Sequence, residues 1–366
     1  MKNQAILKYF SFILTALIFY SCSSSSIIEK SNLPAVTAKD GFSKPRYVEG
    51  ELVVHIKNIK ILTGDSLKKW NIDHNVPASQ APTLLLWSSD IANHINQRDV
   101  KDLSYSMLPT DLFTDEENGN KISFWDLTDK LKDGDSLTVE RTFSYTAYDY
   151  KPDIDKNIVE DDWNKIPDKI KSFYTKSEYL LEQTPEIKEA SQKIVNGIIN
   201  PLDKAYAIFK WVNDTMKYVY PPEERGAAEA LKTCKGDCGQ YSALFIALAR
   251  AAGLPARQQS GFEFSPGNIG YHVWSEIYLP VYGWIPVDAT KPDGFCHLDN
   301  QRLIASVGMN IPIRYSPGWA TYKNSEVENN RIDFMQLVSA VISGVDAEIT
   351  TDRIILKSED KQQPPR

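Results

Sequence analysis

The feature that most constrains this chain is a short polar turn around Cys238 that leads directly into an apolar segment. Apolar residues recur there at the spacing of one helical face, and a row of alanines on another side permits close packing. Gly253, with Pro255 two residues later, is a typical helix stop. The pattern predicts a buried central helix with Cys238 in its first turn, where free N–H groups and the helix dipole favour a thiolate. A buried structural thiol is the alternative, since free cysteines are often buried.

Two aromatic-rich strands downstream predict partners for this cysteine. Residues 270–279 alternate as a strand does, and residues 284–290 form a second strand after a turn at 280–283. If the hairpin pairs even-numbered with even-numbered positions, His272 and Asp288 share one face and lie within reach of each other. A slip of one residue would place them on opposite faces.

A thiol at a helix N-terminus, a histidine and a carboxylate, in this chain order, make up a nucleophilic triad. Cys238 would attack an acyl carbon, His272 would take the thiol proton, and Asp288 would orient the imidazole. This chemistry requires no metal and no organic cofactor. The sequence therefore favours a catalytic Cys238 over a structural thiol.

Four blocks of the sequence resemble the transglutaminase-like superfamily, whose core is papain-like. The blocks are residues 236–245, 248–257, 271–278 and 283–290. The resemblance implies Cys238 as the nucleophile, His272 as the base and Asp288 as the residue that orients the base. The superfamily includes protein cross-linking enzymes, peptidases, amidases and inactive members, and here all three triad positions carry the expected residue types.

The first residues have the pattern of an export signal. Lys2 and Lys8 precede an apolar run that is too short to span a bilayer. A small residue, Cys22 and four serines follow, which resembles a bacterial lipoprotein signal. We expect residues 1–21 to be removed, Cys22 to carry the lipid and residues 22–45 to form a flexible tether. A plain signal peptide with an incidental cysteine is the alternative.

The expected location is therefore the bacterial cell envelope, with the protein lipid-anchored to a membrane and facing the periplasm or the cell surface. The formal net charge is −7, and loss of Lys2 and Lys8 with the signal would make it −9 (−7 − 2). Such a chain is not expected to bind nucleic acid. We expect a peptide, protein or cell-wall amide as the substrate.

The remaining cysteines allow two further arrangements. With Cys22 lipidated and Cys238 catalytic, Cys234 and Cys296 could form a disulfide in an oxidising compartment. A zinc site that adds His297 to Cys234, Cys238 and Cys296 is the competing idea. We expect no metal site, because the Cys-x-x-x-Cys and adjacent Cys-His spacings match no standard zinc pattern.

The length of the chain predicts more than one domain. Short alternating strands predict an all-β, sandwich-like domain over residues 46–152. Helices that begin with proline, followed by the cysteine helix, predict a catalytic domain over residues 153–357, and the polar residues 358–366 should be disordered. The expected fold class is α+β, a β-sandwich followed by a papain-like core whose cysteine helix packs on an antiparallel sheet.

The function expected from these features is amide or peptide hydrolysis through a thioester on Cys238. One alternative is cross-linking of protein glutamine to an amine, which incorporation of a labelled amine would reveal. Another is glycan or protein binding by the sandwich without catalysis, which a fully functional Cys238→Ala variant would favour.

Two details of the expected site stay open. The backbone N–H of Cys238 is one expected oxyanion donor, and Gln240, Tyr241 and Trp274 are candidates for a second, although each also suits a packing role. Glu276 either lies near the site or forms a salt bridge elsewhere.

Overall fold

The computed structural model describes residues 33, 35–37, 39–265, 267–320, 330–336 and 338–366. The expected signal at residues 1–21, the lipidated Cys22 and most of the tether lie outside these ranges. Within them, no helix combines the length and the apolar character that crossing a bilayer requires.

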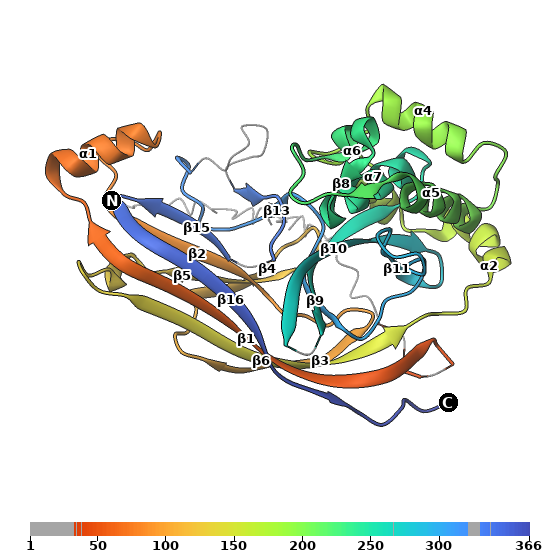
Figure 1. Ribbon diagram of the computed structural model, residues 1–366, viewed down its shortest axis with the longest axis horizontal. Helices are drawn as coiled ribbons and strands as arrows, with labels where there is room; N and C mark the ends of the chain where they lie inside the picture. The colour runs from red at the N-terminus through yellow and green to blue at the C-terminus, as the bar shows by residue number, and fades with distance from the viewer. Residues whose placement is uncertain (1–32, 34, 38, 266, 321–329, 337) are drawn as a thin grey trace, which may run out of the picture.

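The N-terminal part of the chain and its last two strands together form a β-sandwich of two antiparallel sheets (Figure 1). In order across the first sheet, the strands are β16 (Val345–Asp360), β1 (Phe42–Ile61), β6 (Leu137–Tyr150) and β3 (Gln97–Tyr105). The second sheet consists of β15 (Val338–Ser343), β2 (Thr83–Asp90), β5 (Lys121–Asp126) and β4 (Asp111–Thr114). Alternate residues of β1 pack against β2 and Trp125 between the sheets. Helix α1 (Gly64–Asp73) connects β1 to β2.

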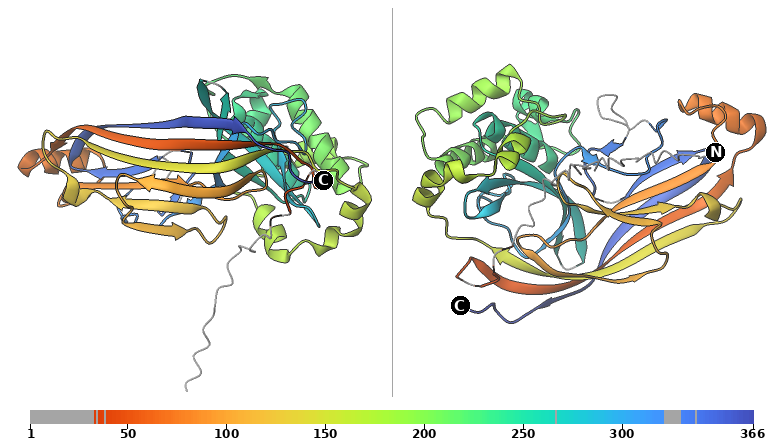
Figure 2. Two further views of the ribbon diagram at one scale, coloured as in Figure 1. Left: turned by 90° about the horizontal axis from the view of Figure 1, so that it is seen from below. Right: turned by 180° about the vertical axis from the view of Figure 1, so that it is seen from behind.

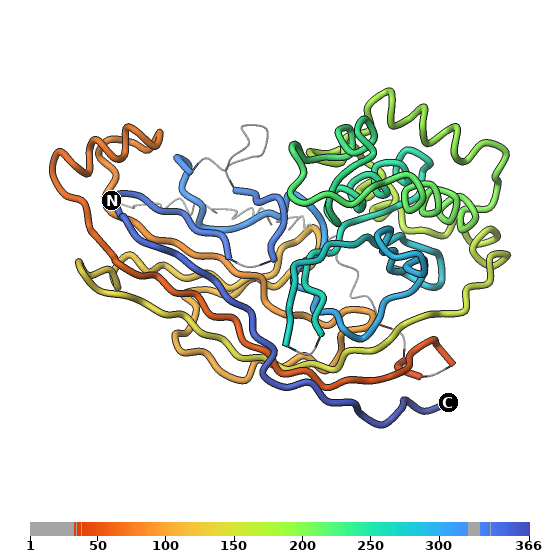
Figure 3. The backbone as a smooth tube through the Cα atoms, in the orientation of Figure 1, coloured from red at the N-terminus to blue at the C-terminus, as the bar shows by residue number. Residues whose placement is uncertain are grey.

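The last two strands belong to this sandwich and not to the sheet that carries His272. β16 pairs with β1 from Arg46↔Asp360 to Ile61↔Val345, and β15 pairs with β2. Figure 3 traces β16 alongside β1 for most of its length. The expected catalytic domain, residues 153–357, is therefore wrong at its C-terminal end. Alternation predicts a strand but not its partner, and without β16 the long strand β1 would be an open sheet edge.

Both outer boundaries of the sandwich also differ from the expectation. β1 begins at Phe42, so the domain starts before residue 46 and the tether ends earlier than expected. Residues 358–360 are the end of β16, and the backbone N–H of Lys361 donates to the carbonyl oxygen of Pro45 (2.8 Å). The expectation of a disordered tail over residues 358–366 is therefore wrong for its first part.

The core is an antiparallel sheet with helices packed on it. The sheet order is β11 (Gly283–Val287), β10 (Asn268–Leu279), β9 (Ala256–Ser265) and β12 (Arg302–Val307). The helices are α2 (Lys156–Asp161), α3 (Asp168–Tyr174), α4 (Pro185–Ile194), α5 (Pro201–Thr215), α6 (Ala227–Thr233) and α7 (Cys238–Ala251). Figure 2 shows α4 to α7 gathered at the end of the molecule opposite α1. The expected α+β class, with a cysteine helix on an antiparallel sheet behind a β-sandwich, is confirmed.

Four short strands form two separate pairs. β7 (Lys217–Tyr218) pairs in parallel with β8 (Lys235–Gly236) just before α7, and β13 (Ile311–Pro312) pairs with β14 (Arg331–Ile332). The β7–β8 pair ties the segment after α5 to the turn that precedes Cys238.

The sandwich packs directly on the core sheet. Phe143 and Tyr145 of β6 form one apolar cluster with Phe262 of β9 and Leu303 of β12. The Tyr145 hydroxyl also donates to the carbonyl oxygen of Arg302 (3.0 Å). The sandwich thus supports the strands that carry the candidate site.

At Gly261, β9 lies close against the backbone of β12, and this glycine provides a test of the packing. A Cβ at this position would collide with the carbonyl oxygen of Leu303. Gly261→Ala should therefore lower the free energy of unfolding by about 1–3 kcal/mol. Gly270→Ala is the matched control, because its Cβ would face open space, and a change within about 0.5 kcal/mol is expected. Equal denaturation midpoints for the two variants would contradict the close approach.

Candidate active site

Cys238 is the first residue of α7 and is only 8% exposed. Asp237 caps the helix, since its side chain accepts a hydrogen bond from the backbone N–H of Gln240 (3.2 Å). Gly236 has φ +154°, and a Cβ there would collide with the side chain of Gln240. The turn before the cysteine therefore requires glycine. It delivers the thiol to the N-terminal end of α7, where unpaired N–H groups and the helix dipole favour negative charge.

The hairpin of β10 and β11 brings His272 and Asp288 together. Its register pairs Glu276 with Pro286 and Tyr278 with Trp284, which is the even-with-even register that the sequence analysis required. His272 Nε2 lies 2.8 Å from Asp288 Oδ2, and both side chains are buried.

Asp288 is held on both of its oxygens. Its Oδ1 accepts hydrogen bonds from the backbone N–H (3.1 Å) and the hydroxyl (2.6 Å) of Thr290. Its Oδ2 faces His272 and also lies 3.2 Å from Arg302 Nη2. Burial raises the pKa of Asp288, but the hydrogen bond with His272, the charge of that histidine and Arg302 together hold it well below its ordinary value. The carboxylate is therefore ionised.

His272 is held in its charged form in the same way. Burial lowers its pKa, but hydrogen bonds with Asp288 and with the Cys238 thiol, together with the charge of Asp288, raise it to about 9. Because Nε2 faces Asp288, Nδ1 is the ring nitrogen left for the thiol. The structure thus brings the three residues singled out in the sequence to one place, and the arrangement can support a thiolate beside an imidazolium.

Arg302 is a residue of this site that sequence reasoning missed. Its guanidinium is buried, lies 2.9 Å from Asp299 and 3.2 Å from Asp288, and stands 5.3 Å from the centre of the Trp274 ring. It belongs to β12, which joins the sheet on the far side of β9, so only the sheet order could have revealed its place. Its charge stabilises the Asp288 carboxylate at Oδ2, the same oxygen that His272 contacts.

Tyr218 is the second missed residue. It lies opposite Gly236 in the β7–β8 pair, and the next backbone N–H, of Val219, donates to the carbonyl oxygen of Gly236 (3.0 Å). Burial raises the pKa of its hydroxyl, and the nearby thiol and backbone N–H of Cys238 also act on that pKa. The side chain is 60% exposed. Its partner Gly236 lies 18 residues later in the sequence, and no alternation marks a two-residue strand.

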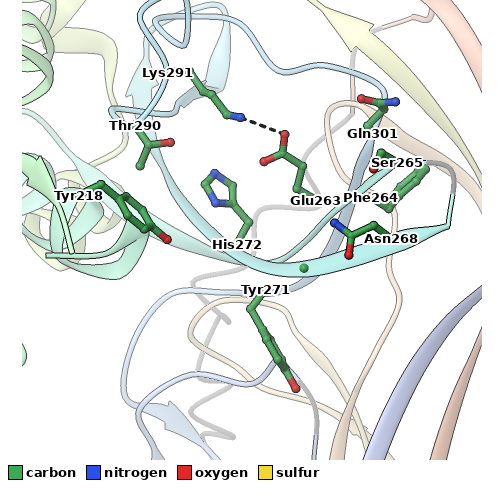
Figure 4. A pocket seen from close by; sticks show the side chains of 11 residues that line it. Tyr218, Glu263, Phe264, Ser265, Asn268, Tyr271, His272, Thr290, Lys291 and Gln301 are labelled. Carbon is green, nitrogen blue, oxygen red and sulfur yellow. Dashed lines mark hydrogen bonds and ion pairs between the residues drawn. The ribbon is translucent and has the colours of Figure 1, made fainter. Parts of the chain in front are cut away.

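A polar pocket of about 440 Å³ opens beside His272 (Figure 4). Tyr218 lies on one side of the histidine, and Lys291 and Glu263 form an ion pair (3.0 Å) on the other. Tyr271 and Gly270 also line the pocket. Its polar lining suits a hydrogen-bonding substrate better than an apolar one.

The three side chains considered as oxyanion donors are all engaged elsewhere. Gln240 hydrogen-bonds through both of its amide atoms to the backbone of the loop before α6. Tyr241 donates to the carbonyl oxygen of Met216 (2.8 Å), and the indole N–H of Trp274 donates to Gln259. These residues therefore have packing roles. Glu276 forms a buried salt bridge with Arg257 (2.7 Å), which was the alternative expected for it.

The remaining cysteines do not form the bridge that the sequence allowed. Cys234, Cys238 and Cys296 are all free. Burial raises the pKa of the Cys296 thiol to about 12. His297 lies 3.3 Å from Asp149. In the part of the chain that the structure describes, no three His, Cys, Asp or Glu side chains are grouped as metal ligands.

Part of the chain is similar to known proteins. Residues 188–289 match the family model of the transglutaminase-like superfamily. An uncharacterized protein of Haemophilus influenzae is 30% identical over 159 residues, which are 34% of this chain and 43% of that protein. The uncharacterized protein YebA of Bacillus subtilis is 24% identical over 135 residues, which are 31% of this chain and 18% of YebA. The chain thus matches less than half the length of each relative.

A solved structure shares the fold of both parts. The crystal structure of a candidate cysteine protease from Cytophaga hutchinsonii matches with a TM-score of 0.53 at 13% identity, over 87% of this chain and 98% of that one. The matched family segment, residues 188–289, contains Cys238, His272 and Asp288. This part of the chain is therefore similar to the core of the transglutaminase-like superfamily.

Proposed function

We propose that this protein is a cysteine hydrolase of amide or peptide bonds, with Cys238 as nucleophile, His272 as acid and base, and Asp288 as the orienting carboxylate. The observation that carries the proposal is the buried His272–Asp288 pair, 2.8 Å apart, beside a thiol at a helix N-terminus. The matched family and the fold shared with a candidate cysteine protease support it.

The reaction has two halves. In the first, the thiolate of Cys238 attacks the carbonyl carbon and forms a C–S bond, and the carbonyl oxygen takes the negative charge. His272 gives its proton to the leaving nitrogen, the C–N bond breaks, and an amine departs from the thioester. In the second, His272 takes a proton from water, the hydroxide forms a C–O bond, and the C–S bond breaks to release the acid and restore the thiolate.

The oxyanion requires donors that are already in place. The backbone N–H of Cys238 is the first donor in our proposal, and the hydroxyl of Tyr218 is the second. Tyr218 shares the pocket with His272 (Figure 4), and the same N–H of Cys238 acts on the pKa of its hydroxyl. With 60% of its side chain exposed, Tyr218 can move aside to admit the carbonyl oxygen.

Water is the acceptor in this proposal, because the pocket beside His272 is polar and open to solvent. We further propose that the enzyme acts in the cell envelope on a peptide, protein or cell-wall amide and is anchored through a lipid on Cys22. The signal-like pattern of residues 1–26 supports the anchor. Metabolic labelling with a palmitate analogue, with Cys22→Ser as control, tests it.

The first test of the proposed function is the rate at which iodoacetamide labels Cys238 as a function of pH. A Cys22→Ser chain is used, and mass spectrometry follows Cys238 beside the partly exposed Cys234, an internal reference. Cys238 should label faster than Cys234 at pH 6, well below the ordinary thiol pKa of about 8.5. Because His272 stabilises the thiolate, His272→Ala should remove this difference.

The class of reaction is then decided with two probes. Turnover of p-nitrophenyl acetate without incorporation of dansylcadaverine into casein supports hydrolysis. Incorporation of the amine would identify a cross-linking enzyme instead. Equal labelling of Cys238 and Cys234 at every pH would contradict the triad.

A further inference from the structure

A side chain from outside the core reaches the strand that carries His272. Gln336 lies between β14 and β15, and its Nε2 donates to the carbonyl oxygens of Gly261 (2.9 Å) and His272 (3.1 Å). Gly261 and His272 are register partners across β9 and β10. One amide group therefore joins both strands at the position of the histidine.

Gln336 is itself held by the sandwich. Arg353 of β16 donates from Nε (3.1 Å) and Nη2 (2.9 Å) to the carbonyl oxygen of Gln336. The preceding residue, Met335, is buried, and its backbone N–H donates to the hydroxyl of Ser306 on β12 (3.1 Å). The amide is thus fixed at its own backbone before it reaches the core sheet.

Arg353 fixes this carbonyl oxygen at a cost in stability, because its guanidinium is buried. Its side chain is 6% exposed, its guanidinium lies 5.1 Å from the centre of the Phe262 ring, and its Nη1 has no hydrogen-bond partner among the described residues. A buried cation without a carboxylate partner costs stability. An interface that only had to pack could use an apolar side chain here. The arrangement is therefore better explained by a need to hold Gln336 in one position.

We infer that Gln336 is a positioning residue for His272, and that β16 acts on the active site through the chain from Arg353 to Gln336 to the His272 carbonyl. The inference rests on the proposed role of His272. Fixing the carbonyl oxygen fixes the peptide plane, and with it the direction of the imidazole toward Asp288 and Cys238. A displacement of about 1 Å at such a group can cost about 100-fold in rate.

The test uses Gln336→Leu, which removes the donor, and Gln336→Asn, whose shorter amide cannot reach both carbonyl oxygens. Gln183→Leu is the matched control, because Gln183 also donates from its amide to a backbone carbonyl, that of Thr175 (2.7 Å), away from this site. Each full-length variant is labelled with ¹³C-histidine, and the His272 resonance, assigned with His272→Gln, is followed by NMR as the pH changes. Iodoacetamide labelling of Cys238 at pH 6 is measured on the same samples.

In both Gln336 variants we expect the His272 titration midpoint to fall by about one pH unit, and Cys238 labelling to slow by about tenfold. Gln183→Leu should change neither. A folded Gln336→Asn protein with the wild-type titration midpoint and labelling rate would overturn the inference. Slow labelling of the wild type would refute the proposed function instead, and the NMR titration would still decide the role of Gln336.

Discussion

Asp288→Asn is expected to slow acyl transfer to p-nitrophenyl acetate by about 100-fold or more. The carboxylate lies 2.8 Å from His272, and its hydrogen bond and charge are among the interactions that raise the His272 pKa to about 9. An amide removes the charge and can present an N–H to the imidazole, which favours the wrong tautomer. The thiolate of Cys238 would then lose its charged partner, so labelling at pH 6 should slow as well.

The control for this prediction is Asp299→Asn. Asp299 also pairs with Arg302 (2.9 Å), so the two variants each remove one carboxylate from the same guanidinium. Only Asp288 contacts His272. Comparable rate losses in the two variants would show that the Arg302 pairing, and not the orientation of the histidine, governs the rate.

The local parts of this site could be predicted from the sequence because local rules determine them. The position of Cys238 follows from a turn and an apolar period, and the pairing of His272 with Asp288 follows from a short hairpin whose parity fixes the shared face. The prediction that these two side chains meet depended on one assumption, that even-numbered residues of one strand pair with even-numbered residues of the other. The pairing of Glu276 with Pro286 shows that the assumption was correct.

The parts that could not be predicted depend on contacts between distant segments. Arg302 reaches Asp288 only because β12 joins the sheet beside β9, and Gln336 reaches His272 only because β15 and β16 return to the sandwich. Residues 345–360 alternate as any strand does, and nothing in that alternation selects β1 as the partner. The sequence therefore predicted the class of the fold and the pairing of His272 with Asp288, but not the residues that support them.

The return of the C-terminal strands changes the relation between the two parts of the protein. β16 runs along β1 on one side of the sandwich, and from it Arg353 holds Gln336 against β9 and β10. Phe143 and Tyr145 pack on the same core strands from β6. The sandwich thus supports the core sheet that carries the candidate site, and loss of β16 would remove part of that support.

Tyr218→Phe is expected to separate two reactions of the same cysteine. Acylation by p-nitrophenyl acetate passes through a tetrahedral oxyanion, so loss of the hydroxyl should slow it by about 100-fold. Iodoacetamide is attacked at its methylene carbon, where iodide leaves and no oxyanion forms. Labelling of Cys238 should therefore keep its wild-type rate. Burial, together with the nearby Cys238 and Asp237, raises the Tyr218 pKa, so the phenol is protonated at neutral pH and can donate.

Tyr271→Phe is the matched control, because Tyr271 lines the same pocket and is similarly exposed. It should leave both reactions unchanged. If Tyr218→Phe instead slowed acylation and labelling equally, the hydroxyl would be supporting the thiolate and not the oxyanion. If acylation became faster, the hydroxyl would be blocking the N–H of Cys238, and the second oxyanion donor would have to come from the substrate or from another part of the chain.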